Sequence, residues 1–269
     1  MADGAPRALH IDDPIIRLDN LSKRFGSLVV FENLSMDIAR GKTTTILGPS
    51  GTGKSVLIKH IVGLLAPDDG SVWVEDVNMV TAPERVKLQV RTKFGMLFQH
   101  GALFDSLTAG ENVEFPMKYH RRSWSAAKRR EVAMEKLRLV ELESFYDAPT
   151  ASLSGGQRKR VGLARAIALE PEVVLFDEPN SGLDPLTSAT IDDLIRRMQR
   201  QLGITFIIIS HDIVQAMHIS DYIGMLFGGT LLEYAAVDDF LHTRHRTVRA
   251  FLQRNVDLPE MDDSELIDP

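Results

Sequence analysis

The residues that decide the fold of this chain read Gly48-Pro49-Ser50-Gly51-Thr52-Gly53-Lys54-Ser55. They fill every fixed position of the pattern G-x-x-x-x-G-K-[ST], a glycine-rich loop whose backbone N–H groups bind phosphate oxygens. Residues 43–47 before the loop are predicted to form a strand, and apolar residues recur at helical spacing after it. The glycines therefore lie where a strand turns into a helix, which is the context that this pattern requires.

The residue types in this loop explain how it would bind phosphate. Gly51 and Gly53 lack Cβ atoms, so backbone N–H groups can close on phosphate oxygens, and the positive end of the following helix adds to the attraction. Lys54 would reach the β- and γ-phosphates, and Ser55 would ligate Mg²⁺. The alternative, an ordinary glycine-rich turn, does not account for a full match in this context. The sequence therefore predicts a nucleoside triphosphate site.

Composition limits the class of protein. The chain has 269 residues, 44% of them apolar, which suffices for one large domain or two small ones. A formal net charge of −6 gives no electrostatic footprint for nucleic acid, so no nucleic-acid partner is expected. Cysteine is absent, which excludes disulfides and fits a reducing compartment. Residues 1–13 do not resemble a signal peptide, and no run approaches the roughly 18 apolar residues that cross a bilayer, so membrane contact is expected to be indirect.

Apolar runs alternate with helical patterns along most of the chain. Strands are predicted at residues 15–18, 28–38, 43–47, 72–75, 94–98, 173–176, 205–209, 222–227 and 230–234. Helices are predicted after the loop and at residues 84–90 and 186–201. A helical block at about 107–169 interrupts this alternation. The order predicts an α/β fold with a parallel core sheet and an inserted helical subdomain.

The same pattern predicts the domain organisation. We expect an N-terminal segment at 1–14, one domain at 15–240 and a C-terminal extension at 241–269. The acidic tail at 257–268 is expected to be mobile. Within the helical block, residues 125–140 form a basic amphipathic segment. The basic residues at 118–122 and 128–130 would meet lipid headgroups or, as the simpler reading, form a solvated helical face.

Two acidic residues follow a continuous apolar strand. Residues 173–176 are typical of a central parallel strand that is buried on both faces, and Asp177 and Glu178 come at its carboxyl end. Ligands of open α/β sheets bind at that edge. Asp177 is placed to hold Mg²⁺ through its hydration shell, and Glu178 to polarise the water that attacks the γ-phosphate. The alternative is that both cap a following helix, which Pro179 disfavours.

Two more strands end in polar side chains. His211 follows the strand at 205–209 closely and could donate a hydrogen bond to the γ-phosphate, although a lone histidine there is more often structural. Gln99 ends the strand at 94–98, and its amide can bind Mg²⁺ or water. Three strands that end in such groups favour a common site at one edge of the sheet.

A second glycine-containing segment, Leu153-Ser154-Gly155-Gly156-Gln157, precedes a helical pattern. Ser154 and Gln157 have the spacing of a capping box, which would start this helix whatever the function. Capping does not need two successive glycines, and these expose N–H groups at the start of a helix. A second anion site in a chain with one phosphate loop suggests that it serves the nucleotide of a neighbouring molecule.

With these motifs the sequence resembles the ATP-binding cassette ATPases, whose signature is L-S-G-G-Q. The resemblance spans residues 15–239 and includes the family's motifs in the family's order. It implies a P-loop NTPase fold with an additional antiparallel β subdomain. It also implies a head-to-tail homodimer that sandwiches two ATP molecules with Mg²⁺, each between the phosphate loop of one copy and Ser154 to Gln157 of the other.

The resemblance also assigns roles to single residues. Lys54, Glu178 and His211 would be catalytic, and Ser55, Gln99 and Asp177 would hold the metal. Phe25 would stack on adenine, although an aromatic residue two positions from a turn is as often part of a core. Gln99 would start the loop that couples to a membrane partner. Residues 181–184 would communicate between the two sites.

Within the family, the sequence is similar to the ATPase subunits of Mla-type, MCE-associated lipid transporters. Residues 98–107, 111–113 and 184–188 carry this likeness. It implies phospholipid transport through a separate integral membrane permease, with an MCE-domain protein, at the cytoplasmic face of the inner membrane. Residues 102–104 would meet a coupling helix of the permease or anchor their own loop. Residues 248–252 could begin an extension that contacts the partner ATPase.

Other functions stay open. A soluble cassette ATPase acting on DNA or the ribosome is one, although the chain shows no sustained heptads and carries one cassette. A transporter ATPase with a cargo other than lipid is another. A P-loop kinase or GTPase is a third, but neither explains the second glycine-containing anion site.

Overall fold

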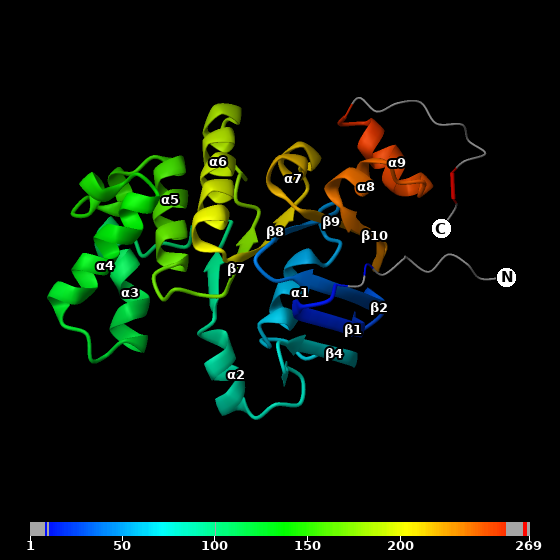
Figure 1. Ribbon diagram of the computed structural model, residues 1–269, viewed down its shortest axis with the longest axis horizontal. Coiled ribbons are helices and arrows are strands. Elements are labelled where there is room, and N and C mark those ends of the chain that lie inside the picture. The colour runs from blue at the N-terminus through cyan, green and yellow to red at the C-terminus, as the bar shows by residue number, and fades with distance from the viewer. Residues whose placement is uncertain (1–8, 10, 100, 257–265, 268–269) are drawn as a thin grey trace. The chain divides into compact units, whose positions relative to one another are not determined.

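A computed structural model describes residues 9, 11–99, 101–256 and 266–267 (Figure 1). The chain forms two compact units, the first made of Met1–Leu88 with Ile209–Pro269 and the second of Gln89–Ile208. It leaves the first unit within helix α2 (Glu84–Arg91) and returns within strand β8 (Thr205–Ser210). The predicted helical block therefore lies wholly within the second unit.

The first unit contains an antiparallel sheet and three strands of a second sheet. The antiparallel sheet has the order β2-β1-β4-β5, and β10-β9-β3 are neighbours in the other. These strands are β1 (Pro14–Phe25), β2 (Leu28–Ala39), β3 (Thr43–Leu47), β4 (Asp69–Val74), β5 (Val77–Asn78), β9 (Tyr222–Phe227) and β10 (Thr230–Ala236). The helices are α1 (Lys54–Ile61), α7 (Ile213–Ile219), α8 (Val237–Leu241) and α9 (Arg246–Gln253). The antiparallel β subdomain implied by the resemblance is confirmed.

Strand β3 carries the phosphate loop, and several contacts fix its position. All five of its residues are buried, and it runs parallel to β9 from the pair Thr44–Tyr222 to the pair Leu47–Met225. At its start, the carboxylate of Asp221 accepts a hydrogen bond from the Thr43 N–H at 2.9 Å. A strand that is buried and anchored in this way gives the loop after it a rigid base.

The C-terminal helices complete the core beside this strand. Phe240 of α8 and Val248 and Leu252 of α9 are fully buried in one cluster with Leu47. Residues 248–252, which we considered as the start of an extension, thus use two side chains for the core of their own chain. The predicted acidic tail lies outside the described residues apart from 266 and 267, and Ile267 pairs with His245 in a parallel bridge.

The second unit combines parallel strands with the helical block. Its strands follow the order β8-β7-β6, and β6 pairs with β7 in parallel from Phe94–Val173 to Leu97–Phe176. The bounds are β6 (Phe94–Leu97), α3 (Ala109–His120), α4 (Ala126–Leu139), α5 (Gly155–Ala166), β7 (Val173–Asp177) and α6 (Pro185–Leu202), with 3₁₀ turns at Glu143–Phe145 and Thr150–Ser152. In Figure 1, α3, α4 and α5 form the green group of helices. The parallel strands and the inserted helices were both predicted.

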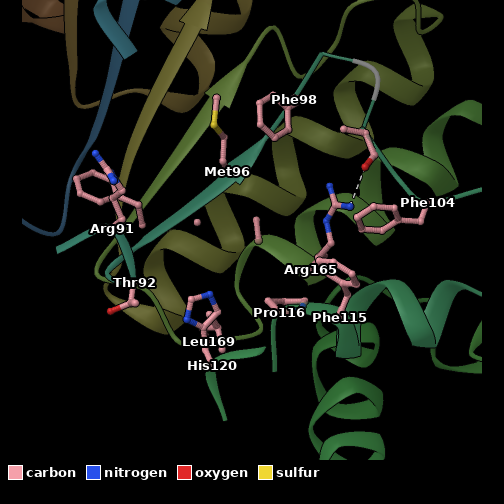
Figure 2. A pocket seen from close by; sticks show the side chains of 14 residues that line it. Arg91, Thr92, Met96, Phe98, Phe104, Phe115, Pro116, His120, Arg165 and Leu169 are labelled. Carbon is pink, nitrogen blue, oxygen red and sulfur yellow. Dashed lines mark hydrogen bonds between the residues drawn. The ribbon is translucent and has the colours of Figure 1, made fainter. Parts of the chain in front are cut away.

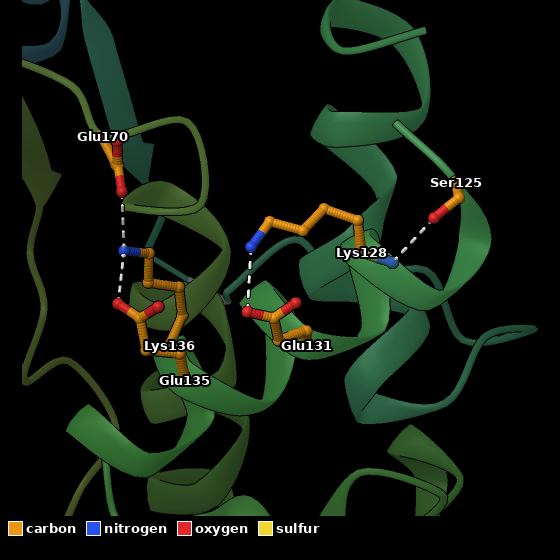
Figure 3. Close-up of polar contacts among 6 residues, drawn as sticks. All are labelled: Ser125, Lys128, Glu131, Glu135, Lys136 and Glu170. Carbon is orange, nitrogen blue, oxygen red and sulfur yellow. Dashed lines mark hydrogen bonds and ion pairs between the residues drawn. The ribbon is translucent and has the colours of Figure 1, made fainter. Parts of the chain in front are cut away.

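The basic residues of the helical block lie at the end of α3 and the start of α4. Residues 118–122 and 128 are exposed. The Lys128 ammonium pairs with Glu131 at 2.9 Å, as Figure 3 shows, and Arg130 pairs with Asp147 at 3.2 Å. These pairs within the chain fit a solvated helical face.

Candidate functional site

The phosphate loop requires glycine at two positions for steric reasons. Gly53 caps the start of α1 with a left-handed φ of 94°, and a Cβ atom there would lie 2.6 Å from Val30 Cγ1. A Cβ atom on Gly48 would lie 2.3 Å from the carbonyl oxygen of Leu226. Gly51 also has a positive φ, of 82°. The loop can therefore keep this backbone shape only with glycine at positions 48 and 53, which are the two glycines that the sequence pattern fixes.

The ammonium group of Lys54 lies inside the loop. The residue is 6% exposed, and its Nζ donates to the carbonyl oxygens of Gly48 at 2.6 Å and Pro49 at 2.9 Å. Ser55 follows in the first turn of α1, which contains no acidic residue. The positive end of this helix is therefore not neutralised by its own side chains, and a positive charge is held at the centre of the loop.

His211 and Phe25 belong to the same unit as the loop. His211 is exposed directly after β8, where the buried Ser210 hydroxyl donates to Gln215 at 2.8 Å and fixes the junction with α7. Phe25 ends β1 and is 48% exposed, with the Lys23 ammonium 5.4 Å from its ring centroid. The reading of Phe25 as a core residue is therefore wrong, and its role in stacking on adenine stays a prediction.

Asp177 and Glu178 lie in the second unit, at the carboxyl end of β7. The next helix, α6, begins at Pro185 and is capped by Asp184, so the reading of these two acids as helix caps is wrong. Glu178 has a left-handed φ of 49°. This conformation costs a residue with a side chain about 1 kcal/mol or more, and such strain clusters at functional sites. Its carbonyl oxygen accepts from the Ser181 N–H at 3.2 Å.

Gln99 contacts the loop that follows Glu178, within the second unit. Its side-chain Nε2 donates to Ser181 Oγ at 3.0 Å. This bond uses the donor end of the amide, whereas metal binding would use the oxygen. The structure thus brings Gln99 next to the loop that follows Glu178, as the common edge of the parallel strands predicted.

Lys159, which was not predicted from the sequence, contacts both Gln99 and Glu178. Its ammonium donates to the carbonyl oxygen of Gln99 and to that of Glu178, the latter at 3.3 Å. Burial lowers the pKa of Lys159, while the nearby carboxylates of Glu178 and Asp177 act in the opposite direction. It lies on the buried face of α5, three residues after the buried Gly156 and four before the buried Leu163. In the sequence, the four-residue spacing from the apolar Leu163 is the trace of this position.

The signature segment starts α5 as predicted. Gln157 N–H donates to the Ser154 hydroxyl at 3.2 Å, and Ser154 N–H donates to Gln157 Oε1 at 2.8 Å, which completes a capping box. Ser154 and Gly155 are exposed. Gly156 has a packing reason, because a Cβ atom there would lie 2.6 Å from Thr187 Cγ2 of α6. Of the two glycines, Gly155 could therefore carry a side chain without a clash, and it lies exposed at the start of the helix.

The predicted site residues divide between the two units. The phosphate loop with Lys54 and Ser55, Phe25 and His211 belong to the first, and Gln99, Asp177, Glu178 and residues 154–157 belong to the second. Within the described part of the chain, no helix is both long enough and apolar enough to cross a bilayer.

Comparisons with known proteins show what this chain is similar to. Residues 31–181 match the family described as ABC transporter. The intermembrane phospholipid transport system ATP-binding protein MlaF of Haemophilus influenzae is 36% identical over 91% of this chain and 92% of its own length. The probable ribonucleotide transport ATP-binding protein mkl of Mycobacterium leprae is 39% identical over 88% of this chain and 68% of its own length.

A solved structure has the same fold. It is the dimeric structure of a post-hydrolysis state of the ATP-binding cassette MJ0796 bound to ADP and Pi. The two chains are 32% identical, and their superposition has a TM-score of 0.74. The alignment covers 82% of this chain and 98% of the solved chain.

Proposed function

The chain belongs to the ABC transporter family and hydrolyses ATP, and we propose that it drives phospholipid transport through a separate integral membrane permease. The proposal that the cargo is phospholipid rests on the similarity to MlaF, which extends over nearly the whole of both chains. The name of the mkl relative gives ribonucleotide as its cargo. The phospholipid cargo is therefore a proposal, and it starts from the ATP hydrolysis that the family shows.

The site residues would divide the reaction between them. The loop with Lys54 binds the phosphates, Glu178 orients the attacking water and His211 contacts the γ-phosphate. The hydroxyl of Ser55, the amide oxygen of Gln99 and the carboxylate of Asp177 are the hard oxygen ligands that suit Mg²⁺. When bound, Mg²⁺ neutralises charge on the phosphates. Positioning and charge stabilisation then account for most of the catalysis.

We propose that two copies bind head to tail, with the signature of one copy facing the phosphate loop of the other. The exposed Gly155 at the start of α5 supports this, because the first N–H groups of a helix can bind an anion that belongs to another molecule. The dimeric state of the MJ0796 structure, with its bound ADP and Pi, supports it as well. No nucleic acid takes part.

A cavity in the second unit is a suitable docking surface for the permease. It has a volume of about 360 Å³ and is lined by the aromatic rings of Phe98, Phe104 and Phe115 (Figure 2). Phe98 and Phe104 are 43% and 41% exposed. Arg165 closes one side by donating to the carbonyl oxygens of Gly101 and Ala102, both at 2.8 Å.

This geometry bears on the two readings of residues 102–104. The rings of Phe104 and Phe115 have centroids 4.4 Å apart and planes tilted by 40°, yet Phe104 keeps much of its surface open, so it is not a buried anchor. An apolar helix of the permease would cover this exposed aromatic surface. His100, within the segment that carries the lipid-transporter likeness, lies outside the described residues.

The test is an affinity pull-down of the chain from detergent-solubilised native membranes, with identification of copurifying proteins and extraction of lipids. Recovery of a permease with an MCE-domain protein and phospholipid is expected. A different permease would keep the ATPase and overturn the cargo, and recovery without any membrane protein would favour a soluble cassette ATPase. We expect the complex at the cytoplasmic face of the inner membrane.

Phe104→Ser is expected to reduce recovery of the permease by roughly tenfold or more, because an aromatic anchor at the centre of an interface is lost. Leu202→Ser is the matched control, since Leu202 is 38% exposed at the end of α6 and does not line the cavity. ATP binding by both variants should equal that of the parent chain. Full recovery of the permease with Phe104→Ser would exclude this cavity as the docking surface.

A further inference from the structure

Four residues of the second unit form a closed ring of hydrogen bonds. Lys159 of α5 donates to the carbonyl oxygens of Gln99 and Glu178. The Ser181 N–H donates to the same Glu178 oxygen at 3.2 Å, and Gln99 Nε2 closes the ring on Ser181 Oγ at 3.0 Å. The ring therefore joins the end of β6, helix α5, the end of β7 and the loop before α6.

The hydrogen bonds of the ring connect the backbone of Glu178 to α5, the helix that begins with the signature. Glu178 has the left-handed φ of 49°, a conformation that persists only where surrounding contacts hold it. Two donors meet on its carbonyl oxygen, and one of them is the side chain of Lys159. Because Lys159 lies five residues after Ser154 on the same helix, a displacement of the signature would move the ammonium that holds Glu178.

We propose that Lys159 is a positioning residue for hydrolysis: it couples the signature at the start of α5 to the backbone of Gln99 and Glu178. The coupling rests on the roles proposed for these two residues. The substrate contact made by the signature would set the direction of the Glu178 carboxylate through the ring. Lys159 itself contacts no reacting atom.

A second buried lysine of the same unit distinguishes this role from ordinary burial. Lys136 of α4 and Lys159 are each 5% exposed. The Lys136 ammonium pairs with the carboxylates of Glu135 at 3.1 Å and Glu170 at 3.3 Å, as Figure 3 shows. Both partners are surface side chains without a proposed catalytic role. Substitution of Lys136 therefore measures how the loss of a buried ammonium affects folding, without an effect on a proposed catalytic residue.

The experiment compares Lys159→Met, Lys159→Arg and the control Lys136→Met in the chain of 269 residues. For each, kcat and KM for Mg·ATP, the affinity for ATP and the thermal unfolding midpoint are measured. Lys159→Met should lower kcat by roughly tenfold or more, the worth of hydrogen bonds to a charged donor, with ATP affinity unchanged. Lys159→Arg should recover part of kcat because it keeps the charged donors, and Lys136→Met should keep kcat.

The proposal fails if Lys159→Met keeps kcat, or if its kcat falls only as far as that of Lys136→Met at equal loss of thermal stability. Where Lys159→Met does not fold, Lys159→Gln replaces it, since its shorter amide cannot span both carbonyl oxygens. Glu178→Gln is assayed alongside. Normal turnover by Glu178→Gln would overturn the role of Glu178 itself, whereas its inactivity beside a fully active Lys159→Met would overturn only the coupling.

Discussion

Replacing Glu178 with glutamine is expected to lower the rate of ATP hydrolysis by roughly 10²–10⁴-fold, the usual worth of a positioned general base. Glutamine has nearly the same shape but cannot accept a proton from water at neutral pH. The phosphate loop is unchanged in this variant, so ATP binding should be retained. Turnover is measured by phosphate release and binding by titration with a fluorescent ATP analogue.

Glu172→Gln is the control for this substitution. Glu172 directly precedes β7, at the opposite end of the strand from Glu178, and pairs with Lys93 at 2.9 Å. Loss of this half-exposed surface pair should cost little, and turnover should stay at the parent value. Near-normal hydrolysis by Glu178→Gln would remove the assignment of Glu178.

Replacing Lys54 with alanine is expected to weaken the binding of ATP by roughly 10- to 100-fold, since a charged hydrogen bond to phosphate is lost. The structure adds a second reason. The Lys54 ammonium holds the carbonyl oxygens of Gly48 and Pro49, so its removal also releases two contacts inside the loop. The affinity is measured by the same titration in the presence of Mg²⁺.

Two further variants separate these effects. Lys54→Met keeps most of the side-chain volume and should bind ATP as weakly as Lys54→Ala if charge decides the affinity. Lys59→Ala removes an exposed lysine of the same helix and should bind like the parent chain. An unchanged affinity of Lys54→Ala would contradict the assignment of the phosphate loop.

The sequence predicted the strands best where apolar runs are continuous. The runs 173–176 and 205–209 are both buried strands. It placed the end of β1 at Leu18, whereas the strand continues to Phe25. Asp19 and Ser22 break the apolar pattern, but the backbone there pairs with β4 at Ser71 and Asp69 through a register shift. Because this pairing uses backbone groups, the side-chain pattern in the sequence does not predict it.

The candidate site was predictable to the extent that its residues end strands or fill a glycine pattern. Glu178 and Gln99 follow from strand ends, and the capping box of Ser154 follows from its spacing. Lys159 did not follow, because a lysine on a helix is usually solvated and its two partners are main-chain carbonyl oxygens. The requirement for glycine at position 156 arises from Thr187 on another helix, which a local pattern cannot reveal.

The proposed dimer gives the most direct test of this account, through the molar mass of the Glu178→Gln chain by light scattering with and without Mg·ATP. We expect the mass to double with Mg·ATP. Adding Gly155→Glu should keep the chain monomeric while it still binds ATP. A Cβ atom at Gly155 has room, at 3.5 Å from Leu183, and an acid suits the first turn of α5 but repels phosphate. An ATP-bound chain that stays monomeric, or a Gly155→Glu chain that dimerises equally well, would contradict the account.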